Sequence, residues 1–122
     1  MAELDVNYRC NCCCEMCQRW QDDRANELTL AEYQKLAAAC YASGVHVVSI
    51  AGGEPLLRDD IFAIIEAFAK YHMKVNLCTN GILLESFAET LCRSDAFCIT
   101  VSIDGATAHI HDKLRGADGS FA

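Results

Sequence analysis

The chain has 122 residues, of which 52% are hydrophobic and 22% charged, and its formal net charge is -7. This length suits one domain with a modest core, and the composition is typical of a globular protein rather than a disordered one. The negative charge argues against nucleic acid and anionic membranes as main partners, because binding to either needs a basic patch. We therefore expect an acidic, soluble protein that binds neither nucleic acid nor a membrane.

The first eight residues, MAELDVNY, lack the basic start and apolar run of a signal peptide. No stretch approaches the roughly 20 apolar residues that span a bilayer. We therefore expect a cytoplasmic location, where the nine cysteines are not expected to form disulfides because the compartment is reducing. Metal ligation or burial is the expected role for these thiols.

The predicted elements alternate between strand and helix. A short strand over Leu4–Tyr8 comes first and precedes a group of cysteines. Thr29 and Glu32 then form a capping box that begins a helix ending at Gly44. The next segment, Val45–Ile50, is rich in β-branched residues and is predicted to be a buried strand.

The same order repeats twice more along the chain. Asp59 and Asp60 suit the positive end of a second helix, and Met73–Thr79 follows it as a strand. A third helix over Leu84–Arg93 precedes a fourth strand over Phe97–Ile103. The apolar face of the second helix consists of Ile61, Ile64, Ile65 and Phe68.

This alternation predicts an α/β fold with a parallel sheet, in which functional groups collect at the carboxyl ends of the strands. An unusual segment follows each of the four strands. These segments are the cysteine cluster, Gly52-Gly53-Glu54-Pro55, Thr79-Asn80-Gly81 and Ser102–Gly105.

The cysteine cluster has five cysteines in the eight residues from Cys10 to Cys17, a density that packing alone hardly explains. Cys10, Cys14 and Cys17 form CxxxCxxC, which suits an iron–sulfur site. Two abutting CxxC pairs, ending at Cys13 and Cys17, offer zinc as an alternative. The pairs of a zinc site usually lie a dozen or more residues apart, so iron–sulfur is the favoured interpretation, with zinc and buried thiols left open.

Four motifs in this order resemble the radical S-adenosylmethionine (radical SAM) superfamily. They are CxxxCxxC after the first strand, Gly-Gly-Glu-Pro after the second, Thr-Asn-Gly after the third and Ser-Ile-Asp-Gly after the fourth. The similarity covers nearly the whole chain. The segment Ile110–Gly116, with Gly119-Ser120-Phe121, further resembles the branch whose members often carry SPASM-type domains and modify peptides or build cofactors.

The resemblance implies that Cys10, Cys14 and Cys17 hold three irons of a [4Fe–4S] cluster, whose fourth iron binds S-adenosylmethionine (SAM). An electron donor such as flavodoxin or ferredoxin would reduce the cluster, which then cleaves SAM to a 5′-deoxyadenosyl radical that attacks the substrate. Met16 is implied to lie near the adenine. The other implied SAM contacts are Gly52, Gly53, Glu54, Pro55, Ser102 and Asp104.

Simpler interpretations stand beside these assignments. The three glycine-containing segments at the strand ends are also typical of turns. Thr79 and Asn80 are expected at the same edge of the sheet. His109 and His111 are expected in an exposed polar loop. Four further cysteines are expected to be buried, namely Cys40, Cys78, Cys92 and Cys98, of which Cys78 lies nearest the functional edge.

The superfamily fold is a partial TIM-type barrel of six βα units, and about the first four strands are predicted here. We therefore expect residues 1–122 to be the N-terminal portion of a radical SAM core domain, apparently truncated, with a fourth helix beginning only near Phe121. The rival interpretations are a non-catalytic cysteine-rich metal-binding module and a thiol redox protein. The small-molecule or peptide substrate and the roles of Cys12 and Cys13 stay open.

Overall fold

The computed structural model describes residues 1–22 and 26–121. Its four strands form one sheet in the order β1-β2-β3-β4, and each neighbouring pair is parallel. This confirms the predicted parallel α/β arrangement. The strands are β1 (Ala2–Asp5), β2 (Val47–Ala51), β3 (Lys74–Thr79) and β4 (Cys98–Val101).

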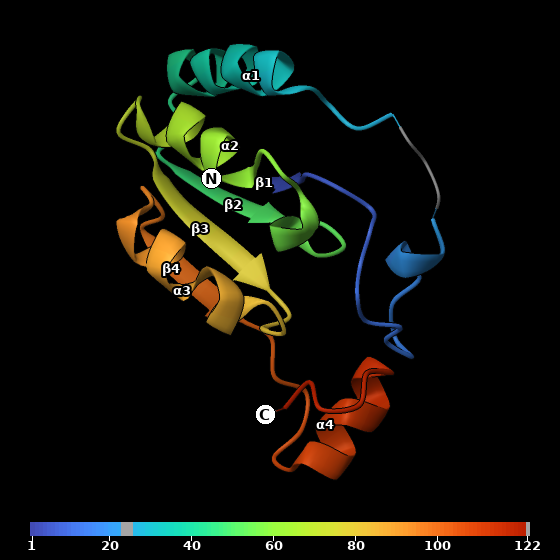
Figure 1. The fold of residues 1–122 in the computed structure, drawn as a ribbon. Coiled ribbons are helices and arrows are strands. Elements are labelled where there is room, and N and C mark those ends of the chain that lie inside the picture. The colour runs from blue at the N-terminus through green and yellow to red at the C-terminus, as the bar shows by residue number, and fades with distance from the viewer. Residues whose placement is uncertain (23–25, 122) are drawn as a thin grey trace.

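Each strand is followed by a helix, and Figure 1 shows α1 and α2 on one side of the sheet. The helices are α1 (Leu30–Ala42), α2 (Ile61–Ala69), α3 (Leu84–Arg93) and α4 (Ala108–Arg115), with two short 3-10 turns, η1 (Arg19–Gln21) and η2 (Pro55–Leu57). Among the described residues no helix is long and apolar enough to cross a membrane.

Helix α4 lies beyond the carboxyl ends of the strands, beside the segment that carries the cysteines (Figure 1). The prediction that a fourth helix begins only near Phe121 is wrong, because α4 already occupies residues 108–115. Thr107 is its N-cap residue, and Gly116 ends it with a left-handed backbone at φ 58°. Thr and Gly are common at these two positions, so the signal was present in the sequence.

The start of α1 confirms the predicted capping box. The Thr29 side chain accepts a hydrogen bond from the Glu32 N–H, and the Glu32 carboxylate accepts one from the Thr29 N–H at 2.7 Å. Gly44 follows the last turn with φ 76°, a conformation that glycine adopts without steric cost. Local chemistry therefore sets both ends of this helix.

The core lies between the helices and one face of the sheet. Val48, Ile50, Val75 and Leu77 alternate along β2 and β3 and have no exposed surface. Fully burying such a side chain contributes about 1.5–3 kcal/mol. The predicted apolar face of α2 is confirmed, since Ile61, Ile64, Ile65 and Phe68 are all buried.

The opposite face of the sheet is polar and is not covered by these helices. Ser49, Asn76, Cys78 and Thr100 lie on it and are joined by hydrogen bonds across β2, β3 and β4. Cys98 lies on the same face at the edge strand β4 and is exposed.

Two of the four cysteines predicted to be buried are in fact exposed. The prediction is wrong for Cys92 and Cys98, whereas Cys40 and Cys78 are half-buried. Cys98 lies on the face of the sheet that the helices leave uncovered, and Cys92 lies on α3 with its side chain exposed.

Arg58 ties the end of β1 to the start of α2. Its guanidinium donates to the carbonyl of Val6 at 2.7 Å and to that of Leu28 at 2.9 Å, and it pairs with Asp60. Asp60 is the N-cap residue of α2, but its side chain makes no capping hydrogen bond. The hydrogen bond from Arg58 instead holds the pKa of the Asp60 carboxyl below its usual value. These contacts of Arg58 hold the backbone at Val6, shortly before the cysteine cluster begins at Cys10.

Candidate functional site

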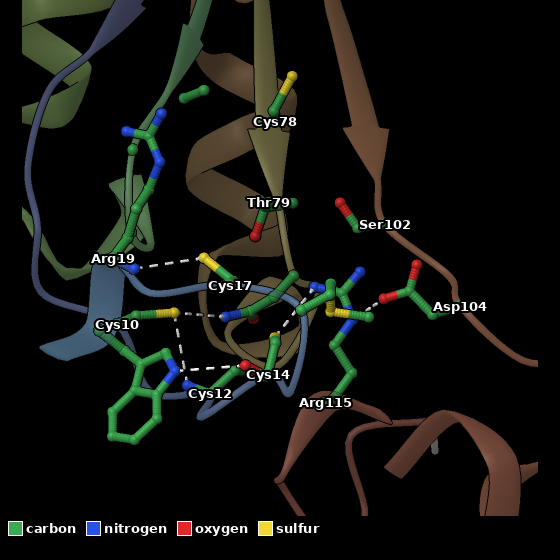
Figure 2. Close-up of a pocket in the computed structure, with 16 residues that line it drawn as sticks. Cys10, Cys12, Cys14, Cys17, Arg19, Cys78, Thr79, Ser102, Asp104 and Arg115 are labelled. Carbon is green, nitrogen blue, oxygen red and sulfur yellow. Dashed lines mark hydrogen bonds and ion pairs between the residues drawn. The ribbon is translucent and has the colours of Figure 1, made fainter. Parts of the chain in front are cut away.

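A cavity of about 310 Å³ opens at the carboxyl ends of β2 and β3, next to the segment that leaves β4 (Figure 2). It collects eight of the ten site residues predicted from the sequence, together with Thr79 and Asn80. Glu54 and Pro55 are the two predicted residues that do not line it. The eight are Cys10, Cys14, Met16, Cys17, Gly52, Gly53, Ser102 and Asp104.

The three cysteines of the CxxxCxxC motif share one feature: each sulfur accepts a hydrogen bond from an N–H group (Figure 2). The Cys10 sulfur accepts from the Cys12 N–H at 3.4 Å and from the Asn80 amide at 3.9 Å. The Cys17 sulfur accepts from the Arg19 N–H at 3.5 Å, and the Cys14 sulfur from the Arg115 guanidinium at 3.9 Å. Such donors stabilise a thiolate, which is the metal-binding form of cysteine.

The two surplus cysteines are placed differently. Cys13 is exposed and does not line the cavity, and its N–H donates to the Arg115 carbonyl at 3.0 Å. Cys12 lines the cavity but is 1% exposed, and burial raises the pKa of its thiol to about 12. Burial also raises the pKa of Cys10, where the two N–H donors act in the opposite direction. No hydrogen bond to the sulfur of Cys12 or Cys13 is found among the described residues.

All nine cysteines lie in the described ranges and are free thiols. Within residues 1–22 and 26–121, no three His, Cys, Asp or Glu side chains converge closely enough to hold a single metal ion. Cys10, Cys14 and Cys17 line one cavity, and their role as cluster ligands stays a prediction.

Gly52 and Gly53 form the part of the wall where two backbone segments touch. A Cβ atom at Gly53 would lie 2.2 Å from the Arg9 carbonyl oxygen, and one at Gly52 would lie 2.6 Å from that of Asn7. The Gly53 N–H donates to the Asn7 carbonyl at 2.9 Å. Glycine is required here because the loop after β2 lies directly against residues 7–9, the segment that leads from β1 to the cysteines.

Glu54 lies behind this wall and is fully buried. Its carboxylate accepts hydrogen bonds from the Thr79 hydroxyl at 2.9 Å, the Asn80 N–H at 2.8 Å and the Leu56 N–H at 3.1 Å. The predicted Thr-Asn-Gly turn is thereby held against the Gly-Gly-Glu-Pro loop. In turn, the Asn80 side chain contacts Cys10, so Glu54 is linked to the cysteine segment through one residue.

The segment after β4 and the end of α4 form another side of the cavity, and they are joined by an ion pair that was not predicted from the sequence. Asp104, after β4, pairs with Arg115 at the end of α4, with 2.7 Å between Oδ2 and Nε. Arg19 and Trp20 also line the cavity without having been predicted. Arg115 lies within the segment Ile110–Gly116, which the sequence analysis had singled out without assigning a role to any of its residues.

The two histidines of α4 do not share one environment. The prediction of an exposed loop is wrong for His111, which is 1% exposed because α4 packs against the turn after β4. Its Nδ1 accepts a hydrogen bond from the Asp104 N–H at 3.1 Å. His111 therefore helps to fix Asp104 and does not line the cavity.

Residues 5–122 match the family model described as the radical SAM superfamily. The chain belongs to the radical SAM superfamily. Its members use a [4Fe–4S] cluster and SAM, and this membership supports the radical SAM interpretation over the zinc-binding and thiol redox alternatives.

Curated relatives cover almost all of this chain. A probable GTP 3′,8-cyclase of Methanopyrus kandleri is 40% identical over 115 residues, which is 93% of this chain and 37% of that protein. The mycofactocin maturase MftC of Mycobacterium ulcerans is 34% identical over 97% of this chain and 32% of its own length. The radical SAM chain described here thus spans about a third of the length of these relatives.

A solved structure confirms the fold. SuiB of Streptococcus suis, in a crystal structure bound to SAM, superposes with a TM-score of 0.83 at 23% identity and covers 95% of this chain and 28% of its own. The predicted partial barrel of parallel strands is therefore confirmed.

Proposed function

We propose that Cys10, Cys14 and Cys17 hold three irons of a [4Fe–4S] cluster and leave one iron open for SAM. The observation that carries this proposal is the set of N–H donors: each of these three sulfurs accepts one, and all three line the same cavity. Cys13 lies outside the cavity, and no hydrogen bond to the sulfur of Cys12 is found among the described residues. The donor set therefore fits a three-thiolate cluster better than either CxxC pair.

We further propose that SAM binds in the same cavity as the cysteines. Gly52 and Gly53 present backbone close to Cys10, while Ser102 and Asp104 supply a hydroxyl and a carboxylate from the end of β4. Met16 is 60% exposed at the rim of the cavity, where an apolar side chain suits the adenine. These five residues contribute one apolar and several polar contacts, as an amphipathic cofactor requires.

The predicted contact between Glu54 and the SAM amino group stays a prediction. Within the described residues, Oε2 of Glu54 accepts only the Asn80 N–H, so that oxygen keeps a second acceptor position. Pro55 is buried at the first position of η2 and maintains the turn that presents Glu54.

When bound, the reduced cluster supplies the electron that cleaves the sulfur–C5′ bond of SAM. The residues of this chain hold the reactants: the cysteine segment fixes the metal, and the ends of β2 and β4 orient the cofactor. We propose that the whole protein receives its electron from a donor such as flavodoxin or ferredoxin.

The proposed substrate of the whole protein is a peptide or a precursor in cofactor biosynthesis. Two findings support this class. The names of curated relatives include a mycofactocin maturase and an AdoMet-dependent heme synthase, and SuiB has been crystallised with the precursor peptide SuiA.

The test is anaerobic reconstitution with iron and sulfide, followed by measurement of bound iron, sulfide and the visible thiolate-to-iron absorption. We expect about four irons per chain, and loss of the visible absorption in Cys10→Ser, Cys14→Ser and Cys17→Ser. Addition of SAM should change the electron paramagnetic resonance (EPR) spectrum of the reduced protein.

Cys13→Ser is the matched control, because it removes a thiol from the same segment outside the cavity and should keep the cluster. A colourless protein that binds zinc would contradict the proposal. So would a cluster that survives Cys14→Ser and disappears in Cys13→Ser.

A further inference from the structure

The carboxyl end of α4 holds the cysteine segment in place. The carbonyls of Leu114 and Arg115 accept hydrogen bonds from the N–H groups of Glu15 and Cys13, both at 3.0 Å. The next residue, Gly116, lies so close that a Cβ atom there would be 2.5 Å from the Cys13 carbonyl oxygen. Two segments about 100 residues apart in the sequence are thus joined by backbone contacts on both sides of Cys14.

Arg115 extends from this junction into the cavity (Figure 2). Its side chain is 11% exposed, its Nε pairs with Asp104 at 2.7 Å, and its Nη1 donates to the Cys14 sulfur at 3.9 Å. One guanidinium therefore bridges the end of β4 and a predicted cluster ligand. A planar guanidinium spreads its charge over several nitrogens and can pair with Asp104 while it donates to Cys14, which a lysine ammonium does less well.

Arg115 also supplies positive charge beside the carboxyl end of α4, where the helix itself contributes partial negative charge. The carbonyl end of a helix carries partial negative charge, and here it faces the segment that holds the proposed thiolates. Adding an electron to a thiolate-bound cluster increases negative charge at the same place. A cation that donates a hydrogen bond to one of the sulfurs reduces the electrostatic cost of this added charge, because hydrogen bonds to the sulfurs and nearby charges tune cluster potentials.

We propose that Arg115 is a positioning residue that orients Cys14 and raises the reduction potential of the cluster, with Asp104 holding its guanidinium in place. This inference rests on the proposed function, because it requires Cys14 to be a ligand. It assigns a role to the segment Ile110–Gly116, which neither the cysteine motif nor the proposed SAM contacts explain.

The test is an EPR-monitored redox titration of the reconstituted protein without SAM, so that the readout is independent of catalysis. In Arg115→Gln we expect the midpoint potential to move to a more negative value than in the wild type. Arg115→Lys keeps the charge and loses the planar group, so we expect a smaller shift in the same direction. Lys113→Gln is the matched control, since it removes an exposed positive charge from the same helix outside the cavity and should keep the wild-type potential.

Wild-type potentials in both Arg115→Gln and Arg115→Lys would overturn the inference. The same conclusion would follow if Lys113→Gln shifted the potential as much as Arg115→Gln, because the effect would then be one of net charge. If Arg115→Gln keeps its circular dichroism but takes up no cluster, the titration of Arg115→Lys decides. A wild-type protein without any cluster would instead contradict the proposed function.

Discussion

The two faces of the sheet differ in chemistry, although the same strands build both. On the face covered by the helices, Val48, Ile50, Val75 and Leu77 are completely buried. On the other face, Ser49, Asn76 and Thr100 form hydrogen bonds, and Cys78 reaches the cavity. Because successive side chains point to opposite faces, one strand supplies both stability and the polar surroundings of the site.

The largest effect that we expect from this difference appears at two adjacent positions of β3. Leu77→Ala removes a fully buried side chain and leaves a cavity, which should lower the free energy of unfolding by about 2–5 kcal/mol. Cys78→Ala, one residue later, loses only weak contacts with Ser49 and Asn76 and should cost less than about 1.5 kcal/mol. Urea denaturation of both variants measures the difference. Equal costs would show that the two faces contribute equally to stability.

A smaller effect is expected at Gly53, in the loop that follows β2. Gly53→Ala places a Cβ atom against the carbonyls of Tyr8 and Arg9, which should cost about 1–3 kcal/mol and displace the approach to the cysteines. We therefore expect lower iron content after reconstitution as well as lower stability.

Gly44→Ala is the control for that variant. Gly44 has φ 76° and open space around it, so the substitution costs backbone strain of about 1–2 kcal/mol without touching the site. Iron content in Gly44→Ala should equal that of the wild type. If Gly53→Ala also keeps full iron content, the close approach at Gly53 is structural only.

The smallest effect concerns the ion pair between Arg58 and Asp60. The hydrogen bond from Arg58 lowers the pKa of the Asp60 carboxyl. Its stabilising effect is therefore present above the unfolded-state pKa, near pH 4, and is lost as the pH falls through the lowered value. Asp60→Asn should reduce stability at neutral pH, and the difference from the wild type should shrink below about pH 4.

Urea midpoints measured from neutral to acidic pH test this expectation. Asp59→Asn is the control, because Asp59 forms no ion pair within the described ranges. A gap between wild type and Asp60→Asn that stays constant with pH would contradict an electrostatic role for Asp60.

Local patterns predicted the elements whose signals are contained within a few residues. The capping box at Thr29, the left-handed Gly44 and the limits of α3 all agree with the structure. The limits of the two edge strands, which pair on only one side, were predicted less well: β1 begins two residues before the predicted strand and ends three residues before its end, and β4 ends two residues early. Helix α4 was missed because the sequence between its caps, Thr107 and Gly116, is short and mostly polar, with Ile110 and Leu114 as its large apolar residues.

Side-chain surroundings were predicted less well than the elements themselves. Cys92 and Cys98 have apolar neighbours in the sequence yet are exposed, and His111 lies in a mostly polar segment yet is buried. Whether a side chain is covered depends on which element packs over it, and that element is often distant in the chain. Arg115 could not be assigned for the same reason, since its partners Cys14 and Asp104 lie on other segments.

The sequence by itself determined the superfamily, the parallel α/β order and the motifs at each strand end, because these depend on local spacing and on the alternation of strand and helix. Only the tertiary structure shows how the surroundings of the five clustered cysteines differ. Three sulfurs meet N–H donors from Cys12, Arg19, Asn80 and Arg115, one thiol is buried and one faces outward. The donors from Cys12 and Arg19 lie two residues from the sulfurs that they contact, whereas Asn80 and Arg115 come from segments remote in sequence, and no spacing along the chain encodes those two contacts.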